Sequence, residues 1–126
     1  AYHLGVTSVV ASAAAWNCLN GRASRVSLGW CYWMDYHRAE SVGEALRELR
    51  ALGIRVYAAE NQFPQPVAPH GDSRWALVVG SEDTGISAEA VAMSDACICV
   101  PQRQGLSMNV AHAASICLYE LSKGRA

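Results

Sequence analysis

Three short apolar runs constrain the fold of this chain more than any other feature. They cover residues 54–58, 75–79 and 96–100, and a further run at residues 6–10 has the same character. Short apolar runs with β-branched residues are typical of buried strands. Helical patterns lie between and after these runs. Because strands that alternate with helices are typical of βαβ units, we predict an α/β fold with a mostly parallel sheet and helices on both of its faces.

The predicted helices have recognisable ends. Ser41 can cap a helix in which apolar residues recur at helical spacing, and Gly53 can end it. Ser87 can cap a short helix over residues 88–93. A last helix is predicted over residues 108–123, and it is apolar on most of its circumference. We therefore expect the last helix to lie between the sheet and another surface, such as a second subunit.

Two segments are less regular. The stretch with Pro64, Pro66 and Pro69 is predicted to be a surface loop, because proline has no N–H to donate to a neighbouring strand inside a sheet. Residues 16–37 show no clear period. Together with the adjacent Arg38 they combine aromatic with basic side chains: Trp16, Trp30, Tyr32, Trp33, Tyr36, Arg22 and Arg25. Such a mixture can stack on nucleic-acid bases or pack in an interface. Both interpretations stay open, and packing is the more ordinary one.

Composition argues against several classes of protein. The sequence contains ten Lys and Arg and eleven Asp and Glu. It therefore lacks the strongly positive net charge of a general nucleic-acid binder. The five cysteines form no C-x-x-C pair, and Cys97 and Cys99 alternate with apolar residues, so reduced thiols and no metal site are predicted. The sequence has no apolar run long enough to span a bilayer and no signal-peptide pattern. We expect a soluble, cytoplasmic protein without membrane contact.

The loops that follow the three predicted strands could meet at one edge of the sheet. They cover residues 59–61, 80–85 and 101–109. In an open parallel sheet, ligands bind outside the carboxyl ends of the strands. Gly80 and Gly85 would let backbone groups approach a flat ligand such as adenine, or they could simply form a tight turn with nothing bound.

Three polar side chains on these loops could converge on a polar substrate: Glu82, Ser107 and Asn109. Each has an ordinary structural role open to it as well. An acid near the start of a helix is favoured by the helix dipole, and Ser or Asn caps helices. His112 is another potential base, although a histidine on a helix face is more often structural. The pattern therefore predicts a site without identifying its ligand.

Two segments in the second half of the chain carry a specific pair of motifs. Residues 78–86 contain a G-x-E-x-x-G turn, and residues 100–110 contain an apolar residue, a proline, a short loop and S-M-N-V. An Ala-rich helix follows and ends near Leu118-Tyr119-Glu120. In these features the chain resembles the SpoU/TrmH-type RNA ribose methyltransferases of the SPOUT superfamily. The resemblance extends through residues 27–29 and 44–60, so it covers nearly all of residues 1–126 as a single domain.

The resemblance implies a parallel α/β domain with a C-terminal trefoil knot that acts as a homodimer. It also implies that S-adenosyl-L-methionine binds in the knot, with contacts at Ala59, Gly80, Gly85, Val100 and Met108. Glu82, Ser107 and Asn109 match the family's polar positions around the reacting centre. The implied activity is methylation of a ribose 2′-hydroxyl in tRNA or rRNA.

In this family, the group that accepts the proton of the ribose hydroxyl is usually taken to be an Arg. That Arg belongs to an early motif, which precedes the end of the first helix. Because Ala1 to Val6 resemble the end of that helix, we expect the chain to be incomplete at its N-terminus, without the first strand and the start of the first helix.

Two other hypotheses about the function remain at this point. One is a catalytically inactive family member that serves as an RNA-binding or assembly subunit. The other is an unrelated nucleotide-binding regulatory domain.

Overall fold

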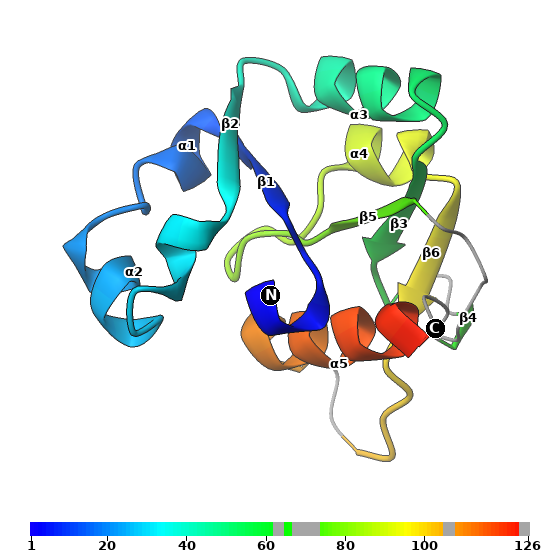
Figure 1. Ribbon diagram of the computed structural model, residues 1–126. Helices are drawn as coiled ribbons and strands as arrows, with labels where there is room; N and C mark the ends of the chain where they lie inside the picture. The colour runs from blue at the N-terminus through cyan, green and yellow to red at the C-terminus, as the bar shows by residue number, and fades with distance from the viewer. Residues whose placement is uncertain (62–64, 67–73, 105–107, 124–126) are drawn as a thin grey trace. The chain divides into compact units, whose positions relative to one another are not determined.

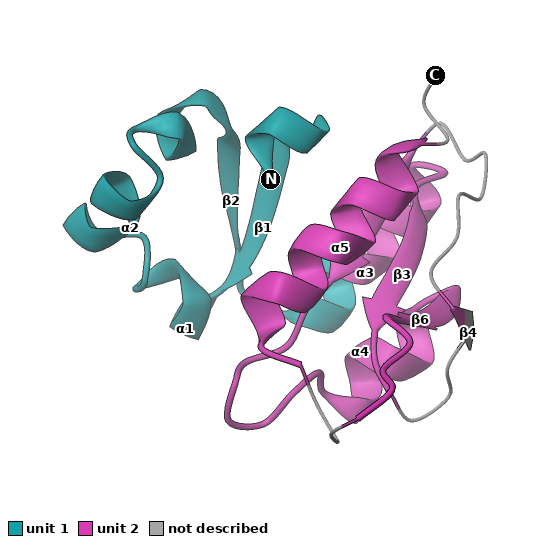
Figure 2. Cartoon of the chain, turned by 90° about the horizontal axis from the view of Figure 1, so that it is seen from below, with its two compact units in different colours: residues 1–45 teal, residues 46–126 magenta. Residues whose placement is uncertain are grey.

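The computed structural model describes residues 1–61, 65–66, 74–104 and 108–123. The chain divides into two compact units, residues 1–45 and residues 46–126 (Figure 2). Each unit has its own parallel sheet. The two units are described separately below.

The first unit is built around a two-stranded parallel sheet (Figure 1). Its elements in chain order are η1 (Tyr2–Leu4), β1 (Ser8–Ser12), α1 (Ala13–Trp16), α2 (Gly21–Val26), η2 (Trp30–Trp33) and β2 (Asp35–Ala39). Strands β1 and β2 pair in register from Ser8 opposite Asp35 to Ser12 opposite Ala39. The first strand was predicted at residues 6–10 and begins two residues later. The segment without a clear period, residues 16–37, contains short helical turns, which are too short to show one.

The second unit holds a four-stranded parallel sheet. The remaining elements are α3 (Val42–Ala51), β3 (Arg55–Ala59), β4 (Gln65–Pro66), β5 (Trp75–Val78), α4 (Ala88–Met93), β6 (Ala96–Cys99) and α5 (Val110–Ser122). The strand order is β4-β6-β3-β5, and every pair is parallel. The predicted α/β class is confirmed. The C-terminal knot implied by the resemblance stays a prediction.

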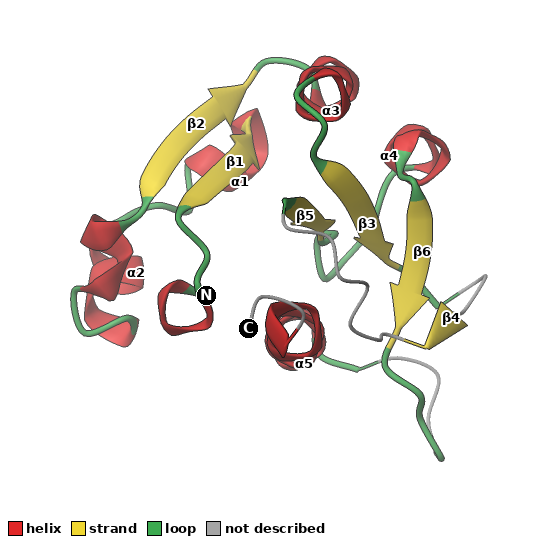
Figure 3. Ribbon diagram, turned by 45° about the vertical axis from the view of Figure 1, so that its right-hand side comes forward, coloured by secondary structure: helices red, strands yellow, loops and turns green. Residues whose placement is uncertain are grey.

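The core of this unit lies on both faces of the sheet. Neighbouring residues of a strand point to opposite faces, so Val56 and Tyr57 of β3 enter different clusters. Helix α5 covers one face, and α3 and α4 cover the other (Figure 3). The cluster under α5 consists of Tyr57, Ile98, Cys117 and Leu121. The opposite cluster consists of Leu46, Val56 and Ala90. Helices on both faces were predicted, and this arrangement confirms them.

Local capping residues set the ends of two helices as predicted. The Oγ of Ser41 accepts a hydrogen bond from the backbone N–H of Glu44 at 3.3 Å, and Gly53 follows α3 with a left-handed φ of 72°. The Oγ of Ser87 accepts from the N–H of Ala90 at 3.2 Å at the start of α4. These ends depend on neighbouring residues only, which is why the sequence indicates them.

Two predictions about loops and ends were wrong in detail. Helix α5 begins at Val110 rather than at residue 108, because the side chain of Asn109 caps it. Pro66 was expected in a loop but pairs with Cys99 in the two-residue strand β4. Strand β4 is at the edge of the sheet, where the missing N–H of a proline interrupts no hydrogen bond between strands. Pro64 and Pro69 lie outside the described residues.

In the part of the chain that the structure describes, no helix combines the length and the apolar character that a membrane crossing requires.

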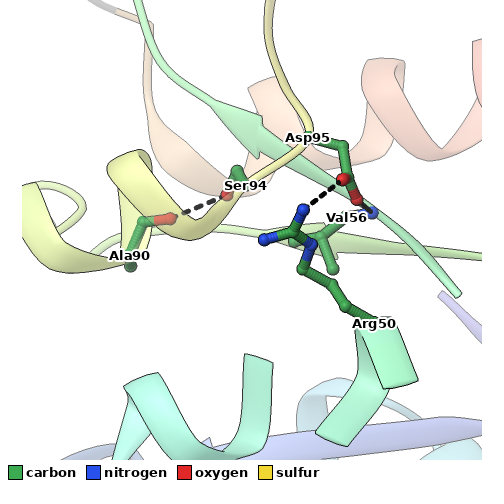
Figure 4. A network of polar contacts seen from close by, with 5 residues as sticks. All are labelled: Arg50, Val56, Ala90, Ser94 and Asp95. Carbon is green, nitrogen blue, oxygen red and sulfur yellow. Dashed lines mark hydrogen bonds and ion pairs between the residues drawn. The ribbon is translucent and has the colours of Figure 1, made fainter. Parts of the chain in front are cut away.

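Asp95 joins the start of β3 to the start of β6 (Figure 4). Its Oδ2 accepts a hydrogen bond from the backbone N–H of Val56 at 2.8 Å, and its own N–H donates to the carbonyl of Val56 at 2.8 Å. Its Oδ1 lies 3.2 Å from Nη2 of Arg50. Val56 is fully buried, so its N–H depends on this carboxylate for a partner.

We therefore expect Asp95→Ala to lower the free energy of unfolding by about 1.5–3 kcal/mol, the range for a hydrogen bond to a charged group. Urea denaturation would measure the loss. Arg50→Ala is the matched control: the Arg50–Asp95 pair is partly exposed, so its removal should cost less than about 1 kcal/mol. Equal losses in the two variants would contradict the assignment of the stabilisation to the Val56 N–H.

Candidate functional site

A pocket of about 370 Å³ is formed by residues that follow β3, β5 and β6 together with the start of α5. It therefore lies at the carboxyl edge of the parallel sheet, where ligands bind in open α/β sheets. The residues predicted for the site that line it are Ala59, Gly80, Glu82, Gly85, Val100, Met108 and Asn109. Ser107 lies outside the described residues. The structure thus brings the predicted residues together from three separate loops.

The loop after β5 is a tight turn closed on itself. The backbone N–H and carbonyl of Ser81 pair with those of Gly85 at 3.3 Å and 3.0 Å, and the Ser81 and Thr84 hydroxyls are 2.7 Å apart. Gly85 has a φ of 68°, which favours glycine. A Cβ atom added to Gly80 would lie 2.1 Å from the carbonyl carbon of Gly85. Gly80 is therefore required by the turn itself, whatever ligand approaches it.

Asn109 links the start of α5 to the turn after β5. Its Oδ1 accepts hydrogen bonds from the N–H groups of Ala111 at 2.9 Å and His112 at 3.4 Å. Its Nδ2 donates to Oε1 of Glu82 at 3.2 Å. The predicted capping role of Asn109 is confirmed, and the same side chain also holds Glu82. His112 is not among the described residues that line the pocket, so nothing in the geometry favours it as a base.

The charge on the pocket wall is negative. Glu60 and Glu82 are both lining residues, and no Lys, Arg or His lines the described part of the pocket. Oε1 of Glu60 accepts a hydrogen bond from the N–H of Asn61 at 2.7 Å. Such a wall favours a cationic ligand and disfavours a phosphate. Over the described ranges, no three His, Cys, Asp or Glu side chains gather in a way that could hold a metal ion.

The family model described as the SpoU rRNA Methylase family matches residues 1–119. The chain belongs to this family. It is 33% identical over 126 residues to an uncharacterized tRNA/rRNA methyltransferase of Mycobacterium tuberculosis, in a match that covers 95% of this chain and 44% of that protein. It is 32% identical over 120 residues to the 23S rRNA (guanosine(2553)-2′-O)-methyltransferase of Bacillus subtilis, covering 93% of this chain and 48% of that protein. The SpoU-family chain thus spans about half the length of these relatives.

Solved structures of SpoU proteins share its fold. The AdoMet-bound rRNA methyltransferase from Sinorhizobium meliloti superposes with a TM-score of 0.86 at 22% identity, covering 96% of this chain and 47% of that one. The SpoU methyltransferase AviRb from Streptomyces viridochromogenes, solved with AdoMet, gives a TM-score of 0.82 at 22% identity, covering 98% and 51%. The predicted α/β fold class is thus shared with these structures.

Two cysteines of this SpoU-family chain form part of the pocket wall. Cys99 belongs to β6, and Cys117 belongs to α5, where its side chain is buried. Burial raises the pKa of the Cys117 thiol, and the neighbouring Cys99 raises it further. The thiol is therefore neutral and weakly nucleophilic, so this wall acts as an apolar surface.

Several polar residues of the pocket were not predicted individually. They are Glu60, Asn61, Ser81 and Gln102. Each lies in one of the loops that were expected to meet at the sheet edge. Their position directly after a predicted strand was the signal that could have identified them.

Proposed function

We propose that this chain is a single methyltransferase domain that uses S-adenosylmethionine to methylate a ribose 2′-hydroxyl of tRNA or rRNA. The observation that carries the proposal is the pocket at the carboxyl edge of the sheet, in a member of the SpoU family, lined by residues that the family resemblance assigns to the methyl donor. The name of the Bacillus subtilis relative, a 23S rRNA guanosine 2′-O-methyltransferase, supports the same class of reaction.

The pocket suits S-adenosylmethionine in size and in charge. Its volume of about 370 Å³ is in the range of sites for small ligands. The carboxylates of Glu60 and Glu82 favour a ligand with positive groups, and S-adenosylmethionine carries a sulfonium and an ammonium. When bound, it supplies a methyl group made electrophilic by the positive sulfur. The residues that would hold it are Ala59, Gly80, Gly85, Val100 and Met108.

The polar pair Glu82 and Asn109 would act on the ribose hydroxyl. A ribose hydroxyl is barely acidic, so its attack needs rigid positioning and a group that accepts or shares its proton. Glu82 is exposed at the pocket, and its carboxylate can share that proton alongside the Arg that the family resemblance implies in an earlier motif. Asn109 holds Glu82 at 3.2 Å while it is itself held by two N–H groups of α5. Ser107 is the third polar residue that the family resemblance assigns to this centre.

The charge of the pocket separates this function from a nucleotide-binding regulatory domain. Phosphate groups would meet two carboxylates and no cation on the described wall, so a nucleotide is disfavoured. Calorimetry on the protein that carries this chain should therefore show binding of S-adenosylmethionine and S-adenosylhomocysteine but not of ATP. Preferential binding of ATP would refute the proposal.

Transfer of a labelled methyl group to total tRNA and rRNA tests the activity itself. Digestion to nucleosides and mass spectrometry should then find a 2′-O-methylated nucleoside. Cofactor binding without transfer to any RNA would instead favour an inactive RNA-binding or assembly subunit.

We also infer that the protein is a homodimer. Helix α5 buries Cys117 and Leu121 but leaves Ile116 38% and Tyr119 53% exposed, and a second subunit could cover these side chains. Ile116→Glu is expected to convert the dimer into a monomer at micromolar concentration, as measured by light scattering. Ala88→Glu, which adds the same charge on α4, should leave the dimer intact. A monomer in the unaltered protein would contradict the inference.

A further inference from the structure

Four rings of the first unit form a cluster that the proposed methyl transfer does not use. They come from η1 and η2: Tyr2, His3, Trp30 and Trp33. The rings of Tyr2 and Trp30 stack with centroids 5.2 Å apart and an interplanar angle of 21°. His3 meets Trp30 edge-on at 4.5 Å. Because η2 is a 3₁₀ helix, residues three apart share one side, which places Trp33 beside Trp30 at 6.4 Å.

The cluster holds its outermost ring in place without burying it. Trp33 is 69% exposed although it contacts both Tyr2 and Trp30, and Trp30 itself is 40% exposed. A large apolar ring gains little from folding when it stays in water, so its contacts orient the ring rather than bury it. The result is a preorganised aromatic surface with an open face.

Two arginines precede Trp30 in the segment that carries this surface. Residues 1–34 contain Arg22 and Arg25 and no Asp or Glu, and Asp35 follows directly. Both arginines belong to α2, and the N–H of Leu28 donates to the carbonyl of Arg25 at 3.1 Å on the way to η2. Among the described residues, neither guanidinium has an acidic partner. The charge is therefore free to meet an anion.

We propose that the surface of Trp30 and Trp33, with Arg22 and Arg25, binds unpaired bases of RNA. A base stacks on the exposed face of Trp33, whose ring is tilted by 45° from that of Tyr2 and by 42° from that of Trp30, and the guanidinium groups contact the phosphates. Aromatic stacking requires a base that is not paired in a helix. The inference rests on the proposed function, and it identifies single-stranded segments as the part of the substrate RNA that this unit recognises.

The test is binding of a fluorescent single-stranded RNA of about 12 nucleotides, a length within the usual range of such sites, against the duplex of the same sequence. Anisotropy should show tighter binding of the single strand. Trp33→Leu should weaken that binding by about fivefold to a hundredfold, the range for loss of one stacked base. Tyr32→Leu is the matched control, since Tyr32 is 77% exposed but lies outside the ring cluster. It should bind as the unaltered protein does.

Two further variants keep the test decisive if Trp33→Leu does not fold, as judged by circular dichroism. Trp33→Phe keeps a ring and should retain most of the affinity. Arg25→Gln should reduce the slope of log affinity against log salt by about 0.7, the value for one phosphate contact on a single strand. An unchanged slope, or equal affinity in Trp33→Leu and Tyr32→Leu, would overturn the proposal.

Calorimetry and light scattering on the same variants distinguish an RNA-binding surface from a protein interface. Binding of S-adenosylmethionine should be unchanged in Trp33→Leu. If the unaltered protein does not bind S-adenosylmethionine, that result would count against the proposed function and not against this surface. If Trp33→Leu converts a dimer into a monomer while RNA affinity stays the same, the surface is a protein interface and the proposal is wrong.

Discussion

Glu82→Gln is expected to lower the turnover of RNA methylation by about a hundredfold to ten-thousandfold, the usual contribution of a general base. The substitution keeps the shape of the side chain and an oxygen that Asn109 can donate to, but it removes the carboxylate that can share the proton of the hydroxyl. Affinity for S-adenosylmethionine should fall much less than turnover, because Glu60 still places a carboxylate on the pocket wall. Calorimetry would give the affinity, and single-turnover kinetics would give the rate.

Variants of Asn109 separate the cap from the contact with Glu82. Asn109→Ala removes the acceptor of two helix N–H groups as well as the donor to Glu82, so it should lose turnover and about 0.5–2 kcal/mol of stability. Asn109→Asp keeps the cap but places a second carboxylate against Glu82, so turnover should fall while stability stays near that of the unaltered protein. Equal losses of cofactor binding and rate in the Glu82 and Asn109 variants would mark both residues as structural.

Gly80→Ala is expected to weaken S-adenosylmethionine binding by more than about tenfold and to lower the free energy of unfolding by about 1–3 kcal/mol, the usual cost of overpacking. The added Cβ would lie 2.1 Å from the carbonyl carbon of Gly85 and 2.4 Å from the backbone nitrogen of Ile86. The turn must therefore open, and Gly85 and Ile86 line the pocket. Calorimetry and urea denaturation would measure the two losses.

Two other glycines serve as controls for Gly80. Gly21→Ala has open space around the new Cβ and should change neither quantity. Gly85→Ala also has open space, but its φ of 68° strains an L side chain, so an intermediate loss is expected. If Gly80→Ala behaves like Gly21→Ala, the turn is looser than its hydrogen bonds indicate.

The ends of the helices and strands around the candidate site could be predicted because each end depends on a short stretch of sequence. Ser87 caps α4 through the N–H of Ala90, three residues away, and Gly53 ends α3 through its own left-handed φ. Strand ends follow from where apolar runs stop, and parallel strands bring their carboxyl ends to one edge. The loops of Ala59, Gly80 and Met108 were therefore placed together correctly before their contacts were known.

The sequence by itself determined the class of fold, the helix caps and the loops that form the pocket, because those features depend on residues close together in the chain. Tertiary structure alone decided the contacts between distant residues. Glu82 and Asn109 are 27 positions apart, and the carboxylate of Asp95 meets the N–H of Val56 across 39. Pro66 became a strand residue only because Cys99 lies beside it at the sheet edge. No local pattern encodes such pairings, since each forms only when packing of the apolar side chains has brought the strands together.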